Sequence, residues 1–197
     1  LIALIIVAAI VLTFIIDGFN EVKIDVKGGG IYGEFMLPKN NTEGSIAIIV
    51  AGSGPTNRNG NSEYQSGRND SLKALAYELK KNNIASFRYD KRSSGKSKET
   101  FTDSQVNFDL FVDDLIEVIK HIKNQKGFKK IYLIGHSQGA LVSALAAQKE
   151  KVDGVIFVAG AARPIDEVLI EQIERQNRND LNEIKDIINA LRDGRRV

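Results

Sequence analysis

The sequence has 197 residues, of which 43% are hydrophobic and 26% charged, with a formal net charge of +2. These values are ordinary for a globular domain with a sizeable core, and they exclude a disordered or collagen-like chain. Lys and Arg residues form no basic stripe, so no nucleic acid partner is expected. The chain has no cysteine and two histidines, His121 and His136, which excludes disulfides and cysteine metal sites.

The first sixteen residues form an apolar run with Thr13 as the one polar side chain, and Asp17 ends it. This length is slightly below the about 17 to 25 residues of a membrane-spanning helix, and it also suits the apolar part of a signal peptide. We interpret residues 1–18 as a transmembrane anchor or signal segment. An uncleaved anchor is preferred, because no small-residue cleavage pattern follows the run, and a buried helix is the third alternative. The first two interpretations predict a protein that is membrane-anchored facing outside the cytoplasm, or secreted.

Beyond Asp17 the sequence alternates between strand and helix patterns. Residues 22–26 and 31–37, separated by glycines at 28–30, predict a β-hairpin. Apolar runs predict further strands at 46–50, 84–89, 131–134 and 155–158. Helices are predicted after an N-cap at Asp70 or Ser71, at 108–122 and at 140–148. The alternation indicates an α/β fold with a mostly parallel sheet and helices on both faces, and we assign its N-terminal part to residues 21–162.

The segment 163–197 has a different character, with helical spacing of apolar residues among many charges and no strand pattern. It is interpreted as a helical lid or cap segment, or alternatively as a pair of amphipathic surface helices. Within the core, Asp113, Asp114 and Glu117 give the helix at 108–122 an acidic face, which we expect to be solvated.

The pentapeptide Gly135-His136-Ser137-Gln138-Gly139 follows a predicted strand and opens a small-residue helix. A strand that turns sharply into a helix exposes the serine hydroxyl, and glycines on both sides are needed because neighbouring β-carbons have no room. This context predicts that Ser137 is a nucleophile. The alternative is a serine that only caps its helix.

A serine nucleophile that attacks an acyl carbon needs hydrogen-bond donors for the resulting oxyanion. The elbow supplies the backbone N–H of Gln138, the residue after the nucleophile. A second donor is expected from the loop after the strand at 46–50, where Ala51-Gly52-Ser53-Gly54-Pro55 lets the backbone approach a substrate closely. The backbone N–H of Ser53 is our candidate, and a tight turn without a ligand is the alternative.

Three motifs in order, at 51–60 (AGSGPTNRNG), 88–97 (RYDKRSSGKS) and 135–139 (GHSQG), resemble bacterial α/β-hydrolases of the serine-aminopeptidase-like, S33-type group, including EstD-type esterases. The resemblance runs from about residue 22 to residue 158. It implies Ser137 as the nucleophile, the backbone of Ser53 and Gln138 as the oxyanion hole, and a lid after the strand at 155–158. Asn57 stands where the family pattern has aspartate.

In α/β-hydrolases the catalytic acid and then the histidine follow the serine in the chain, and no histidine follows His136. His136 immediately precedes Ser137 and is expected to point away from it, and His121 is expected to face solvent on its helix. Two explanations are open: the sequence is a fragment that lacks the C-terminal Asp and His and leaves the sheet edge incomplete, or catalysis has been lost. The fragment is preferred.

These observations predict a serine hydrolase that cleaves a small-molecule carboxylic ester or thioester through an acyl-enzyme on Ser137, without a cofactor. A serine aminopeptidase-like peptidase and an acyl-CoA thioesterase are alternatives with the same nucleophile. A non-catalytic binding protein with the α/β-hydrolase fold is the alternative of a different class.

Overall fold

The computed structural model describes residues 21–40, 44–92, 94–101, 106–176 and 180–197. Contacts divide the chain into two compact units, with the boundary between Gly160 and Ala161. The predicted anchor or signal segment, residues 1–18, lies outside the described residues and stays a prediction. None of the described helices is long and apolar enough to cross a membrane.

The first unit is built on a six-stranded mixed sheet with the strand order β1-β2-β4-β3-β5-β6. Its strands are β1 (Glu21–Val26), β2 (Gly29–Met36), β3 (Ser45–Val50), β4 (Ala85–Tyr89), β5 (Lys130–His136) and β6 (Gly154–Val158). The hairpin β1–β2 pairs antiparallel with β4, whereas β4, β3, β5 and β6 run parallel. The prediction of a mostly parallel α/β sheet preceded by a hairpin is confirmed.

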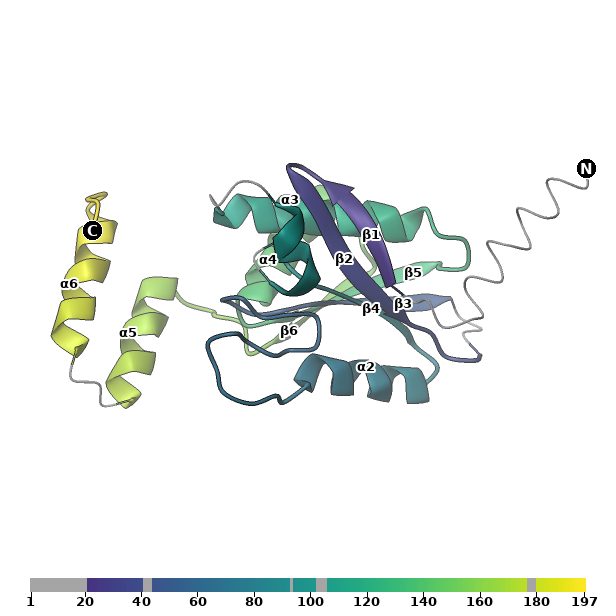
Figure 1. The fold of residues 1–197 in the computed structure, drawn as a ribbon, viewed down its shortest axis with the longest axis horizontal. Helices are drawn as coiled ribbons and strands as arrows, with labels where there is room; N and C mark the ends of the chain where they lie inside the picture. Colours follow the sequence, from purple (N-terminus) through teal and green to yellow (C-terminus); the bar gives the residue numbers. More distant parts are fainter. Residues whose placement is uncertain (1–20, 41–43, 93, 102–105, 177–179) are drawn as a thin grey trace, which may run out of the picture. The chain divides into compact units, whose positions relative to one another are not determined.

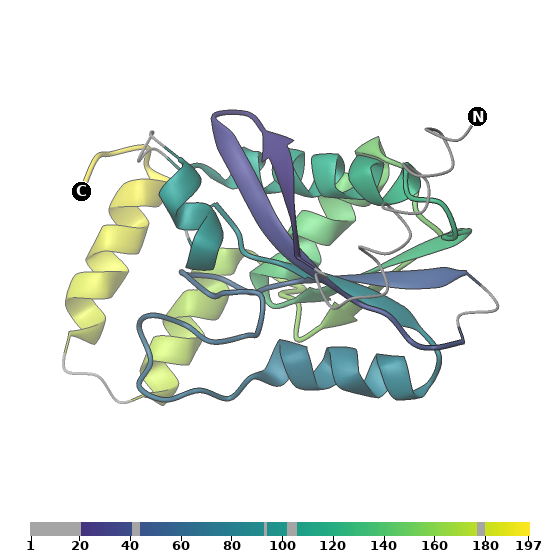
Figure 2. The same cartoon turned by 45° about the vertical axis from the view of Figure 1, so that its right-hand side comes forward.

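Helices cover both faces of this sheet, as Figures 1 and 2 show. Helices α3 (Phe108–Lys123) and α4 (Gln138–Lys149) pack on one face, and α2 (Ser71–Lys81) packs on the other. Two apolar clusters result: the α3 and α4 side contains residues such as Leu115 and Ile119, and the α2 side contains Leu72 and Ala76. Burial of this apolar area is the main contribution that holds the layers together.

Strand β3 lies in the middle of the sheet, and all six of its residues are buried. Its last residue, Val50, pairs with Gly135 on β5, and Ile49 pairs with Arg88 on β4. The carboxyl ends of these three parallel strands therefore meet at one edge of the sheet. Loops that begin at this edge carry the motifs singled out in the sequence, which is where ligands bind in open α/β sheets.

Strand β6 lies at one edge of the described sheet, and its last three residues are exposed. The exposed fractions are 50% for Ile156, 59% for Phe157 and 42% for Val158. The second unit contains α5 (Ile165–Arg175) and α6 (Leu181–Arg192), which pack on each other. The prediction that the described residues after 163 are helical is confirmed, and their role as a lid stays a prediction.

The segment after β4 contains a 3₁₀-helix, η1 (Gly95–Thr100), which Ser97 anchors by accepting from Tyr32 N–H at 2.8 Å. Asp70 is at the N-cap position of α2, as predicted, but its side chain makes no capping hydrogen bond. Its carboxylate instead accepts a hydrogen bond of 2.7 Å from Asn61 Nδ2, and its backbone is left-handed with φ 45°.

Candidate active site

Ser137 occupies the junction between β5 and α4 in a backbone conformation with φ 52° and ψ −120°. A positive φ of this kind is strained for a residue that carries a β-carbon. The surrounding chain holds it in place: Ser137 N–H donates to the carbonyl oxygen of Val158 at 2.9 Å, and its own carbonyl accepts from Ala140 N–H at 2.9 Å. The junction is thus a sharp strand-to-helix turn, as the sequence predicted.

The two glycines of the pentapeptide are required by close backbone contacts. A β-carbon on Gly139 would lie 2.4 Å from the carbonyl oxygen of Val50 and 2.7 Å from that of Ala51. A β-carbon on Gly135 would lie 2.4 Å from the carbonyl oxygen of Gly139. The first turn of α4 therefore sits directly on the end of β3, which is possible only without side chains at these positions.

A pocket of about 350 Å³ opens beside Ser137. Its walls come mostly from the loop after β3 and from the start of α2, and they are rich in glycine, hydroxyl and amide groups. The lining residues are Gly52, Ser53, Gly54, Thr56, Gly60, Ser62, Tyr64, Gln65, Asn69, Ser71, Leu72, His136 and Ser137. The structure therefore brings Ser53 and Ser137 to one pocket, although 84 positions separate them in the sequence.

Gln138 is the first residue of α4. The first N–H groups of a helix have no carbonyl partner within the helix, and they carry the positive end of its dipole. The backbone N–H of Gln138 is therefore a donor next to the Ser137 side chain. The dipole of α4 also stabilises any negative charge that forms beside Ser137.

The two histidines lie in different surroundings. His136 lines the pocket, and a β-carbon on Gly52 would lie 3.0 Å from His136 Nδ1 and 3.3 Å from Ser137 Cβ; the direction of its ring relative to the Ser137 hydroxyl stays a prediction. His121 is half-buried on α3, next to the side chain of Gln125, and this burial lowers the pKa of its imidazole. His121 does not line the pocket.

Asn57 organises the loop that forms the pocket wall. Its Oδ1 accepts hydrogen bonds from the N–H groups of Asn59, at 2.9 Å, and Asn61, at 3.2 Å. This role uses only the acceptor oxygen, which an aspartate also has, so an aspartate at this position would support the same turn. Asn61 then extends the same pattern by accepting from the N–H groups of residues 69 and 70.

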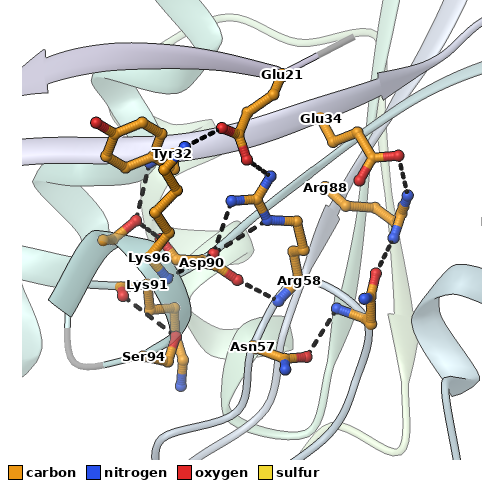
Figure 3. A network of polar contacts seen from close by, with 12 residues as sticks. Glu21, Tyr32, Glu34, Asn57, Arg58, Arg88, Asp90, Lys91, Ser94 and Lys96 are labelled. Atoms are coloured by element: carbon orange, nitrogen blue, oxygen red, sulfur yellow. Dashed lines mark hydrogen bonds and ion pairs between the residues drawn. The ribbon is translucent and has the colours of Figure 1, made fainter. Parts of the chain in front are cut away.

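A buried ion pair fastens this loop to the end of β4. Asp90 accepts three hydrogen bonds from Arg58: from the backbone N–H at 2.7 Å, from Nε at 3.0 Å and from Nη2 at 2.8 Å. Arg58 Nη1 continues to Glu21 on β1 at 2.8 Å, and Glu21 also binds Lys96 on η1 (Figure 3). Although burial lowers the pKa of Arg58, the hydrogen bonds and charges of its two carboxylate partners prevail, and the pKa is raised.

A neighbouring pair corrects the prediction of a solvated acidic face on α3. Asp114 is buried, and Arg92 binds it through Nε at 2.8 Å and through Nη2. Burial raises the pKa of Asp114 even though Arg92 opposes this change. Asp113 and Glu117 remain at the surface, so only Asp114 of these three acidic residues is buried.

Lys91 is a further buried charged residue that the sequence did not single out. Its Nζ donates to the carbonyl oxygens of Gly52 and Gly54, the latter at 2.8 Å, on the two sides of Ser53. Among the described residues, no group of three or more His, Asp or Glu side chains is arranged to hold a metal ion. The site therefore consists of a strained serine, backbone donors and a loop held by buried cations.

The fold and this arrangement define an α/β-hydrolase. The family model for serine aminopeptidase, S33, matches residues 66–186, and the chain belongs to this family. Esterase EstD of Thermotoga maritima is 31% identical over 158 residues, a match that covers 80% of this chain and 36% of the esterase. The chain thus spans about a third of the length of this curated relative.

Solved structures agree with this assignment. Est1E from Butyrivibrio proteoclasticus, in a structure with ferulic acid bound, is 25% identical with a TM-score of 0.57, covering 80% of this chain and 57% of that one. An α/β serine hydrolase without lid from Xanthomonas campestris is 26% identical with a TM-score of 0.57, covering 73% of this chain and 62% of that one.

Proposed function

We propose that the protein containing this chain cleaves carboxylic esters of small molecules through an acyl-enzyme on Ser137. The observation that carries the proposal is the strained conformation of Ser137 at the mouth of a pocket that the Gly52–Gly54 loop also lines. Strain of this kind persists in proteins where function requires it. The esterase name of the curated relative supports an ester rather than a thioester.

In this mechanism the Ser137 hydroxyl attacks the acyl carbon and the carbonyl oxygen of the substrate becomes an oxyanion. The N–H groups of Gln138 and Ser53 then donate to that oxygen, and the dipole of α4 favours its charge. Collapse of this intermediate breaks the ester C–O bond; the general base, which takes the proton of the Ser137 hydroxyl during the attack, gives it to the departing alcohol oxygen, and the acyl group stays on Ser137. Water subsequently hydrolyses the acyl-enzyme and regenerates the serine.

The proposal gives the role of general base to neither histidine of this chain. His121 lies away from the pocket on α3, and the His136 ring is packed against Gly52 beside the Ser137 β-carbon. A base in the full gene product is therefore expected outside this sequence. Replacement of His136 by glutamine should then lower turnover by no more than a few-fold, whereas loss of a base costs about three to six orders of magnitude.

The proposed nucleophile is tested on the full gene product by fluorophosphonate labelling and by hydrolysis of p-nitrophenyl esters. We expect Ser137→Ala to abolish both. Ser143→Ala is the matched control, because Ser143 is buried on the same helix and its Oγ makes no hydrogen bond within the described structure. The control variant should label and turn over like the wild type. Unchanged labelling of the Ser137→Ala protein would remove the basis of the proposal.

Aminopeptidase activity is the second candidate, because the family model carries that description. The same variants assayed with aminoacyl p-nitroanilides and with esters of matched acyl groups separate the two functions. The pocket side chains are hydroxyl and amide groups with Tyr64, Leu72 and His136, and none of them is an Asp, Glu, Lys or Arg, which suits a neutral acyl group. We therefore expect ester turnover to exceed anilide turnover.

A further inference from the structure

Three consecutive carbonyl groups around Ser53, those of Gly52, Ser53 and Gly54, accept hydrogen bonds. Lys91 Nζ binds those of Gly52 and Gly54. Thr56 adds two bonds, from its N–H to the Gly54 oxygen at 2.8 Å and from its hydroxyl to the Ser53 oxygen at 2.9 Å. Three consecutive peptide planes are thereby fixed, and Lys91 holds the first and the last of them.

The orientation of the Gly52 carbonyl determines where the Ser53 N–H points. In a trans peptide the C=O and the following N–H point in opposite directions. The Gly52 carbonyl points to Lys91, which is 4% exposed and does not line the pocket. The Ser53 N–H consequently points away from Lys91, and Ser53 lines the pocket that Ser137 also lines.

We propose that Lys91 is a positioning residue for ester hydrolysis: its ammonium group fixes the Gly52–Ser53 peptide so that the Ser53 N–H faces the oxyanion formed at Ser137. This inference rests on the proposed function. The cation also polarises the peptide it binds, which makes the N–H at its other end a stronger donor. A positively charged donor forms hydrogen bonds roughly twice as strong as a neutral one, so the protonated state of Lys91 holds the loop best.

The surroundings of Lys91 keep its charge sensitive to pH. Its Nζ lies 5.3 Å from the centre of the Phe111 ring of α3, and the charged neighbours Asp90 and Arg92 are each engaged with another residue. Burial lowers the pKa of Lys91 to about 8. The ammonium group therefore loses its proton as the pH rises through about 8, and the hold on the two carbonyl groups weakens in the same range.

The test compares Lys91→Met with the wild type in the full gene product, using p-nitrophenyl ester kinetics across the pH range. Loss of one oxyanion donor costs about 100- to 1,000-fold in kcat, so loss of its support should lower kcat by about 10- to 100-fold. KM should change by less than about threefold, because the lysine does not line the pocket. The wild type should lose kcat above pH 8, and the methionine variant should lack this alkaline decline.

Two further variants complete the comparison. Lys120→Met is the matched control, since Lys120 is a half-exposed lysine of α3 that binds Glu117 and does not line the pocket, and it should keep the wild-type kcat and pH profile. Lys91→Arg keeps a positive charge at every pH of the assay and should restore part of kcat without the alkaline decline. Circular dichroism and thermal unfolding verify that each variant is folded.

The outcomes separate this inference from the proposed function. If Ser137→Ala is inactive while Lys91→Met keeps kcat and its alkaline decline, the role of Lys91 is overturned and the nucleophile stands. If Ser137→Ala remains active, both are overturned. If Lys91→Met raises KM and leaves kcat unchanged, a positioning role is likewise contradicted, because oxyanion donors act in the transition state.

Discussion

Replacement of Ser137 by glycine should make the protein more stable while removing the proposed nucleophile. The φ of 52° and ψ of −120° match the first central residue of a type II′ turn, a position that glycine dominates. A residue with a β-carbon held in such a region costs of order 1–3 kcal/mol. Glycine removes this strain, but it gains about 0.4–1 kcal/mol of conformational freedom in the unfolded chain. The net expected gain lies between about 0 and 2.6 kcal/mol in the free energy of unfolding, with a central value of about 1.3 kcal/mol.

The matched comparison is Ser137→Ala, which removes the same hydroxyl and keeps the β-carbon and therefore the strain. Urea or thermal unfolding of the two variants isolates the backbone contribution, since both lack activity. For a domain of 150 to 250 residues, 1 kcal/mol shifts Tm by about 2–4 °C, so the central gain should raise the Tm of the glycine variant by roughly 3–5 °C. Lower stability of Ser137→Gly relative to Ser137→Ala would refute the argument from strain.

Three other substitutions test the contacts that hold α4 and the pocket loop in place around Ser137. Gly139→Ala places a β-carbon 2.4 Å from the Val50 carbonyl oxygen, so it should cost about 1–3 kcal/mol of stability in urea unfolding and lower fluorophosphonate labelling. Arg58→Met leaves the carboxylate of Asp90 buried without its main partner and should cost about 3–5 kcal/mol by the same measurement. Asn57→Asp keeps the acceptor oxygen of the turn, and we expect ester turnover within about twofold of wild type.

Each of these expectations has an outcome that contradicts it. A Gly139→Ala protein with wild-type labelling would show that α4 can move away from β3 without harm to the site. An Arg58→Met protein as stable as a variant of the exposed pair, Arg68→Met, would show that the buried pair contributes no more than a surface one, about 0–1 kcal/mol. A large loss in Asn57→Asp would mean that the amide NH₂ has a role of its own.

The elements of the core were predictable because their patterns are local. The six buried residues of β3 and the apolar stripe of α3 are legible in short windows of sequence, since period and burial reflect the geometry of a single element. The sharp turn at Ser137 was predictable for the same reason. Its glycines, its serine and the strand before it lie within nine consecutive residues, 131–139.

The contacts that hold the site are of a different kind. Arg58 and Asp90 are 32 positions apart, and Arg92 and Asp114 are 22 apart. Nothing in a window around either partner shows which charges become buried together. The expectation that Asp114 is solvated was therefore wrong.

By itself, the sequence determined the α/β class, the place of Ser137 on a strand-to-helix turn, and the glycines that such a turn requires. Local sterics settle these features, because a backbone at positive φ or within 2.4 Å of a carbonyl restricts residue type directly. Only the tertiary structure decided that Lys91 binds the carbonyl groups beside Ser53, since parallel strands bring together loops that the chain separates. The physical reason is that buried charges are satisfied by whichever polar groups the packed strands place next to them.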